Sequence, residues 1–260
     1  MTGEAAIRLG SFLGILLVLM LAERFVPRVA KRPLGWRRWP ANLAMPAIGT
    51  LLVRLVAPAG AVGAAIWAEG QGIGLMRALP GWLAIPLAVL LLDLAIYAQH
   101  RVFHAVPALW RLHSMHHADP ELDATTGLRF HPLEILASLA IKVALVVAMG
   151  APAVAVLAFE VLLNATSLFS HADIRIPAPI DRWLRLVLVT PDMHRTHHAE
   201  ARVDTDSCFG FCLPWWDRLF GSYRPAPVGG LDAAVIGVPG LRATPEQRLG
   251  RLLVQPFRRG

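Results

Sequence analysis

The histidines of this chain are grouped at spacings that suit metal binding. All ten lie between residues 100 and 198, and eight of them form three clusters. Side chains three or four residues apart lie on one face of a helix, with Cβ atoms roughly 5–6 Å apart, so neighbouring imidazoles can reach one metal ion. The clusters are His100 and His104; His113, His116 and His117; and His194, His197 and His198. The single residues His131 and His171 are two further candidate ligands.

The number of histidines limits the kind of metal centre. A structural zinc ion is usually satisfied by four ligands, so ten histidines exceed one such site. They suffice for two ions with four or five nitrogen ligands each. Neutral imidazole binds zinc, copper, iron and nickel, and residue type alone therefore predicts only two metal ions of this borderline class.

The composition places the chain in a membrane. Hydrophobic residues make up 55% and charged residues only 17%, and the mean hydropathy is +0.51, which is too apolar for a soluble domain of this size. The net charge is +7, but the arginines mainly flank apolar segments, where they suit anionic lipid better than nucleic acid. Cys208 and Cys212 make no disulfide framework and are expected to be free thiols.

The apolar segments predict an all-α, integral membrane helical bundle. Residues 5–26, 42–67 and 81–99 give about three early spans, and 133–149 with 151–169 give one helical hairpin around Gly150 and Pro152. The loop after the first span holds the densest positive charge, which places it in the cytoplasm and the N-terminus outside. Its charged residues are Arg28, Lys31, Arg32, Arg37 and Arg38. The histidines then form a cytoplasmic, helical, histidine-rich cap.

We expect a single membrane domain over residues 1–260. Residues 1–99 form the transmembrane anchor helices, 100–223 the histidine-cluster catalytic region including the hairpin 133–170, and 224–260 a cytoplasmic tail. Residues 180–189 are amphipathic and are expected to lie at the membrane surface. The aromatic residues expected at headgroup level are Trp215, Trp216, Phe220 and Tyr223.

Polar residues share helix faces with the histidines and are candidate catalytic residues. Asp93 and Tyr97 precede His100 and His104 at i, i+4, i+7 and i+11, so Asp93 is a candidate hydrogen-bond partner for a metal-bound ring. Glu160 and Asn164 precede His171 at similar spacing. The alternative for each is a polar contact between helices without a catalytic part. Glu134, three residues after His131, either orients that ring or caps the hairpin.

The ordered series of motifs resembles the fatty acid hydroxylase and sterol desaturase superfamily of membrane di-iron enzymes. The resemblance covers roughly residues 93–223. It implies two iron ions, O2 as co-substrate, a fatty acyl or sterol-like lipid substrate, and His131 and His171 as ligands beside the three clusters. The motifs are Asp93, Tyr97, His100, Arg101 and His104; Leu109-Trp110-Arg111 with His113, His116 and His117; Arg129, His131-Pro132 and Glu134; Phe169 and His171; Thr190-Pro191 with His194, His197 and His198; and Trp216-Asp217-Arg218-Leu219-Phe220-Gly221 with Tyr223.

The sequence also bears on partners and on rival functions. No glycine-rich dinucleotide motif or haem attachment motif is visible, so electrons are expected from an external donor of ferredoxin or cytochrome type, as the resemblance implies. Many relatives carry Asn-Tyr/Phe-Gly after the third cluster, whereas this chain has Ser207-Cys208-Phe209-Gly210, which weakens any transfer of a relative's substrate. The alternatives are a divalent-metal transporter and a non-catalytic membrane lipid-binding metalloprotein. The sequence does not indicate the oligomeric state.

Overall fold

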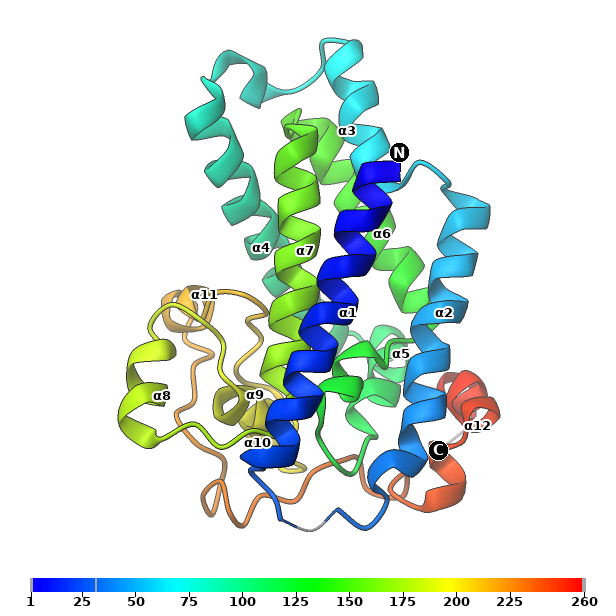
Figure 1. Ribbon diagram of the computed structural model, residues 1–260, viewed down its shortest axis with the longest axis vertical. Helices are drawn as coiled ribbons and strands as arrows, with labels where there is room; N and C mark the ends of the chain where they lie inside the picture. Colours follow the sequence, from blue (N-terminus) through cyan, green and yellow to red (C-terminus); the bar gives the residue numbers. More distant parts are fainter. Residues whose placement is uncertain (1, 31, 259–260) are drawn as a thin grey trace.

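The structure is a computed structural model that describes residues 2–30 and 32–258. Long helices form a bundle along one axis, and shorter helices gather at one end of it (Figure 1). The bundle consists of α1 (Thr2–Phe25), α2 (Trp39–Val56), α3 (Gly60–Gly70), α4 (Gly81–Ala105), α6 (Pro132–Met149) and α7 (Ala153–His171). The short ones are α5 (Pro107–His117), α8 (Ala178–Leu184), α9 (Pro191–His197), α10 (Arg202–Thr205), α11 (Trp215–Leu219) and α12 (Leu249–Val254), with 3₁₀ turns η1 (Gly35–Arg38), η2 (Leu75–Ala78), η3 (Ala124–Leu128), η4 (Thr244–Gln247) and η5 (Gln255–Phe257).

Five helical segments of the described chain are long and apolar enough to cross a membrane. They are Gly3–Phe25, Gly35–Gly70, Gly81–Ala105, Pro132–Met149 and Ala153–His171. Large apolar side chains face outward on them; on α1, for example, Leu17 is 59% and Val18 64% exposed. Outward apolar faces along helices of membrane-spanning length are typical of contact with lipid. The protein is therefore an integral membrane protein.

The second span is broken into two helices. The sequence predicts one span over 42–67, but α2 ends at Val56 and α3 begins at Gly60. Ala57 precedes Pro58, and the residue before a proline is sterically disfavoured in the α conformation. Gly60 follows at φ +59°, a conformation that favours glycine. Both halves contact α6, so the break bends the segment along the hairpin.

The expected helical hairpin is present as α6 and α7. Gly150 ends α6 in the left-handed conformation at φ +64°, and Pro152 directly precedes the first residue of α7. A Cβ atom at Gly150 would lie 2.5 Å from the carbonyl oxygen of Ile73, so the turn also needs glycine for close packing. The hairpin contributes to the main apolar core together with α3 and α4.

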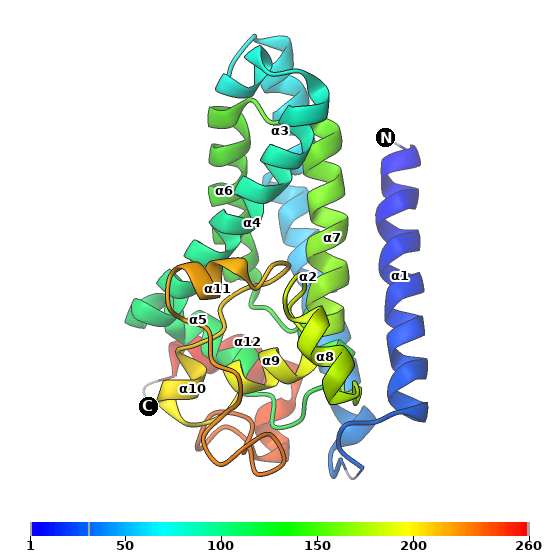
Figure 2. The same ribbon diagram turned by 90° about the vertical axis from the view of Figure 1, so that its left-hand side faces the viewer.

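The histidine-bearing cap lies at the end of the bundle where α1, α4 and α7 finish (Figures 1 and 2). The C-terminal segment folds onto it, because Leu252 of α12 is buried against Met45 of α2 and Met115 of α5. On α8, Ile180 and Trp183 are 54% and 65% exposed, which fits the expected position at a membrane surface. Trp216 was expected at headgroup level, but it is buried, and its indole donates to Asp93.

Candidate metal centre

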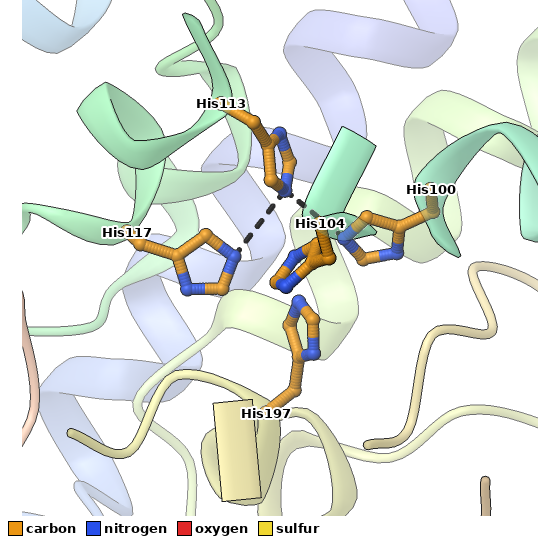
Figure 3. A group of neighbouring side chains, drawn as sticks. All are labelled: His100, His104, His113, His117 and His197. Atoms are coloured by element: carbon orange, nitrogen blue, oxygen red, sulfur yellow. Dashed lines mark hydrogen bonds between the residues drawn. The ribbon is translucent and has the colours of Figure 1, made fainter. Parts of the chain in front are cut away.

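Nine of the ten histidines converge in two groups inside the cap. In each group one ligand atom per residue lies within 4.8 Å of the others, and every member is buried. Two nitrogen atoms that are each about 2 Å from one ion lie at most about 4 Å apart, so a small contraction suffices for shared coordination. The first histidine group, drawn in Figure 3, contains His100, His104, His113, His117 and His197, and the second contains His116, His171, His194 and His198.

Two short helices divide their side chains between the groups. On α5, His113 and His117 are four residues apart and enter the first group, while His116 points to the second. On α9, His197 enters the first group and His194 the second, joined by His198 just beyond the helix. Helix α4 adds His100 and His104, and the end of α7 adds His171.

The two groups adjoin each other. The rings of His117, in the first group, and His198, in the second, are stacked with centroids 4.4 Å apart. His116 also lies 5.3 Å from His113, measured between ring centroids across the boundary. Ions bound in the two groups would therefore be neighbours, as in a binuclear centre.

Hydrogen bonding shows that the first group fits a cation. The Nδ1 atom of His100 donates to the carbonyl of Phe209 at 2.8 Å, and that of His113 faces a carboxylate oxygen of Glu134 at 2.7 Å. In a neutral imidazole the Nε2 atom then carries only a lone pair. Yet the Nε2 atoms of His100 and His113 lie 3.0 Å apart. Two facing acceptors are unfavourable unless a cation lies between them, so the arrangement suits a metal ion.

The second group gives the same result. The Nδ1 atom of His171 donates to the carbonyl of Ser167 at 2.6 Å, which leaves a lone pair on its Nε2 atom. The Nε2 atoms of three other histidines lie 3.0–3.2 Å from that one atom. One lone pair cannot satisfy three donors at once, whereas four converging lone pairs suit one metal ion. The three Nε2 atoms that surround Nε2 of His171 belong to His116, His194 and His198.

Burial keeps the rings in the form that binds metals. Removal from water lowers the pKa of His116, His117, His194 and His198 well below the usual value, and neighbouring imidazoles lower it further. Burial likewise lowers the pKa of His197 to about 3. Neutral imidazole is the ligating form, so these rings need lose no proton before binding a metal near neutral pH.

Comparison with known proteins identifies the family. The fatty acid hydroxylase family model matches residues 85–222, more than half of the 260 residues. The chain belongs to the fatty acid hydroxylase family. The matched region contains all ten histidines and both candidate metal groups, so the family predicted from the histidine motifs is confirmed.

Two relatives of this fatty acid hydroxylase family protein are named as lipid-modifying enzymes. Ornithine lipid hydroxylase OlsE of Rhizobium tropici is 27% identical over 144 residues, which cover 55% of this chain and 42% of that protein. Alkylglycerol monooxygenase of Homo sapiens is 30% identical over 139 residues, covering 53% of this chain and 30% of that protein. The matches thus span less than half of each relative. No solved structure matches the chain.

Two histidines have carboxylate partners that fix their rings. Glu134 was expected either to orient the His131 ring or to cap the entry to the hairpin. In the structure one of its carboxylate oxygens lies 2.7 Å from Nδ1 of His113. Glu134 lies in the first turn of α6, which contacts α5, so its partner ring is 21 residues away in sequence. Asp206 is the second partner, 3.3 Å from Nδ1 of His104. Such partners set ring orientation and basicity in metal sites.

His131 lies outside both groups. Its Nδ1 atom accepts from the backbone N–H of Leu133, so the side chain caps the start of α6. Its Nε2 atom donates to the carbonyl of Leu253 at 3.2 Å. Both ring nitrogens are therefore engaged elsewhere, and the structure does not bring His131 to the nine converging rings.

The candidate catalytic residues of α4 bind residues between 212 and 222 and not the histidines. Asp93 was expected to partner a metal-bound ring, but its carboxylate accepts from the backbone N–H groups of Cys212 and Leu213 and from the Trp216 indole. The hydroxyl of Tyr97 lies 2.8 Å from Oγ of Ser222. The helical spacing correctly placed both residues on the face of His100, but their direct partners come from a distant loop.

The candidates on α7 are also separated from the centre. Glu160 pairs with Lys142 at 2.6 Å and with Arg8 at 2.5 Å, which ties α7 to α6 and α1. Asn164 donates back to the carbonyl of Glu160 within the helix. Their spacing correctly placed both residues on the helix that carries His171. Their polar groups, however, make contacts between and within helices, which is the alternative that the sequence left open.

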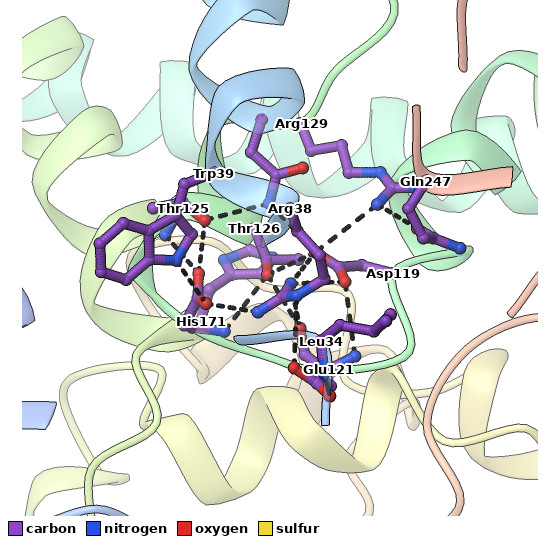
Figure 4. A network of polar contacts seen from close by, with 12 residues as sticks. Leu34, Arg38, Trp39, Asp119, Glu121, Thr125, Thr126, Arg129, His171 and Gln247 are labelled. Atoms are coloured by element: carbon purple, nitrogen blue, oxygen red, sulfur yellow. Dashed lines mark hydrogen bonds and ion pairs between the residues drawn. The ribbon is translucent and has the colours of Figure 1, made fainter. Parts of the chain in front are cut away.

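A buried ionic network beneath the second group was not predicted from sequence (Figure 4). Arg38, at the end of η1, pairs with Asp119 and Asp123 from the loop after α5. Burial alone would raise the pKa of Asp119, but Arg38 and Arg129 outweigh it, and the pKa lies below its usual value. Arg129 donates to the carbonyl of Met115, next to His116, and so anchors the end of α5.

Cys208 and Cys212 are free and buried, as expected. Burial raises the pKa of the Cys208 thiol to about 12 and also raises that of Cys212 above the usual value. Both thiols are therefore protonated near neutral pH and unreactive as nucleophiles.

Proposed function

We propose that the protein is an O2-dependent, di-iron lipid hydroxylase of the membrane. It would insert one oxygen atom into a C–H bond of a lipid chain: C–H, O2, two electrons and two protons give C–OH and water. The observation that carries the proposal is the pair of adjoining, buried histidine groups at one end of a membrane bundle.

The histidines would divide the two ions between them. The first group offers five imidazole nitrogens and the second offers four. Imidazole binds several transition metals, and family membership is the reason to choose iron. A pair of iron ions bound there would supply the activation of O2 and the removal of hydrogen from an unactivated C–H bond.

The chain's own residues keep this centre ordered and dry. Glu134 holds the His113 ring through its Nδ1 atom, and the carbonyl of Ser167 does the same for His171. The Phe130 ring stacks on His116 with centroids 4.5 Å apart, and Phe211 lies 5.1 Å from His100. These apolar rings limit the entry of water, which protects reactive oxygen chemistry from side reactions.

The substrate proposal follows from the relatives' names and from the bundle. One relative is an ornithine lipid hydroxylase and the other an alkylglycerol monooxygenase, so a membrane lipid with a fatty acyl or alkyl chain is the substrate class we propose. The histidine groups lie where α4 and α7 end, so a lipid chain from one leaflet would approach them from the bundle side.

The proposal also covers the source of the electrons and the side of the membrane on which the cap lies. The reaction consumes two electrons, which we assign to an external ferredoxin or cytochrome-type donor docking on the cap. The arginine-rich segment after α1 faces the same end as the histidines, and the positive-inside rule then assigns the cap to the cytoplasm. Arg28 and Arg32 of this segment pair with carboxylates of the cap.

The test is oxygen incorporation into lipid. Membranes containing the intact protein, or its His104→Ala variant, are supplied with ¹⁸O2 and a reducing system, and total lipids are compared by mass spectrometry. We expect a hydroxylated lipid carrying one ¹⁸O atom with the intact protein only. Identical lipid profiles in the two samples, at equal protein content and with two irons per chain in the intact protein, would overturn the proposal.

A further inference from the structure

The segment from Ser207 to Leu213 passes directly beside the first histidine group. Its carbonyl groups accept hydrogen bonds from two members: Ser207 from Nδ1 of His197 at 2.7 Å, and Phe209 from Nδ1 of His100 at 2.8 Å. Cys208, between them, has φ +51°, a left-handed conformation that is uncommon for a residue other than glycine. This bend turns both flanking carbonyls toward imidazole rings, and it persists only if the surroundings hold it.

Two buried carboxylates hold this loop. Asp217 accepts the backbone N–H of Phe209 on one oxygen at 2.7 Å and that of Gly210 on the other at 2.9 Å. Asp93 accepts the N–H of Cys212 and that of Leu213 on separate oxygens, each at 3.2 Å. Both carboxylates are at most 1% exposed, so these hydrogen bonds are protected from competing water.

The same loop is joined to helix α4 by two direct contacts and by one that runs through Ser222 and Asp217. Asp93 binds the loop's far end, and His100 binds its middle through the carbonyl of Phe209. Between them Tyr97 lies 2.8 Å from Oγ of Ser222, whose hydroxyl donates to Asp217 at 2.7 Å. The polar face predicted from the spacing of these α4 residues therefore positions a loop, and the loop in turn orients the ligands.

We propose that Asp93 and Asp217 are positioning residues that set the geometry of the first metal site by holding the loop Ser207–Leu213. This rests on the metal-binding function proposed above. The loop contributes through backbone carbonyls, so its contacts to His197 and His100 do not depend on the side chains at Ser207 and Cys208. Gly210 is constrained, because a Cβ atom there would lie 2.9 Å from Oδ2 of Asp217.

The experiment uses Asp93→Asn and Asp217→Asn in the full-length, iron-loaded protein. An asparagine keeps one acceptor oxygen but turns an N–H donor toward the second backbone N–H, so the loop must shift. We expect the affinity of the first site to fall about 10–100-fold, as for other residues that support metal ligands. The second group has no hydrogen bond to this loop among the described residues, and its ion should remain. Chelator titration should therefore remove the ion of the first group before that of the second, the reverse of the order expected for the wild type.

A second measurement does not depend on bound metal. In metal-free protein, hydrogen exchange at the amides of Phe209, Gly210, Cys212 and Leu213 should be faster in both variants than in the wild type. Ser222→Ala, which removes only the hydroxyl between Tyr97 and Asp217, should give a smaller loss of affinity at the same site. Ser222→Ala replaces the aspartate variants in both measurements if either of them does not fold.

Glu121→Gln is the matched control. Glu121 also receives two backbone N–H groups, from Leu34 and Gly35 at 2.7 and 2.8 Å, but in a loop away from the first group. It should keep both irons. Wild-type affinity and wild-type amide exchange in both aspartate variants would overturn the inference, as would equal losses at the two sites in Ser222→Ala. A wild-type protein without two irons would instead overturn the proposed function and leave the exchange test in force.

Discussion

The contact between Glu134 and His113 gives the sharpest test of the carboxylates beside the centre. Their 2.7 Å contact joins two buried side chains, with Glu134 only 6% exposed. A charged acceptor makes a hydrogen bond roughly twice as strong as a neutral one. Loss of such a partner typically costs 10–100-fold in metal affinity. We expect about tenfold for Glu134→Gln, which keeps a neutral acceptor, and about 100-fold for Glu134→Ala.

Asp206 provides the internal comparison. It lies 3.3 Å from Nδ1 of His104, and its side chain is 34% exposed, so water screens and competes with the contact. Asp206→Asn should change the affinity of the first site less than about threefold. The assay is competition with a graded series of chelators, reading iron per chain at equilibrium. Wild-type affinity in Glu134→Gln, or a larger effect from Asp206→Asn, would refute the reasoning.

Three further predictions follow from the same contacts. His131→Ala removes the side chain that accepts the Leu133 backbone N–H at the start of α6, and the free energy of unfolding should fall by about 1 kcal/mol. Both irons should be retained. Loss of one iron would show that His131 is a ligand. Glu160→Gln removes the charged partner that Lys142 and Arg8 share, and the free energy of unfolding should fall by about 3 kcal/mol. The iron content should stay at two per chain. Iron loss at unchanged stability would contradict the role of Glu160 as a contact between helices. Finally, in the wild-type protein chelation should remove the ion of the second group first, because three of its rings have Nδ1 atoms without a partner among the described residues. A fast phase that survives in His194→Ala would contradict this order.

The sequence predicted those features that depend on local periodicity. A spacing of four residues correctly indicated which histidines enter the same group, but the pairs three residues apart, which were expected to converge on one ion, are divided between the two groups. The breaks at Gly150 and Pro152 predicted the hairpin. Apolar length predicted the spans, except that Pro58 and Gly60 divide the second one. The family was predicted from the ordered series of motifs over residues 93–223, and the family model matches the same region.

The partners of the polar side chains could not be predicted in the same way. Helical spacing gives the direction in which Asp93 points, but the groups that meet it, near Cys212 and Trp216, are more than 100 residues away in sequence. Glu134 is near His131 in sequence, yet the contact between the start of α6 and helix α5 places it against His113. Asp206 lies in a loop without a recognisable pattern, so no local signal marks its contact with His104.

The central claim is that nine histidines hold two neighbouring iron ions. It is tested most directly by metal analysis and Mössbauer spectroscopy of the purified, full-length protein after iron-replete expression. We predict two irons per chain whose spectra show magnetic coupling between them. At most one iron per chain, or full occupancy by zinc without iron, would contradict the account.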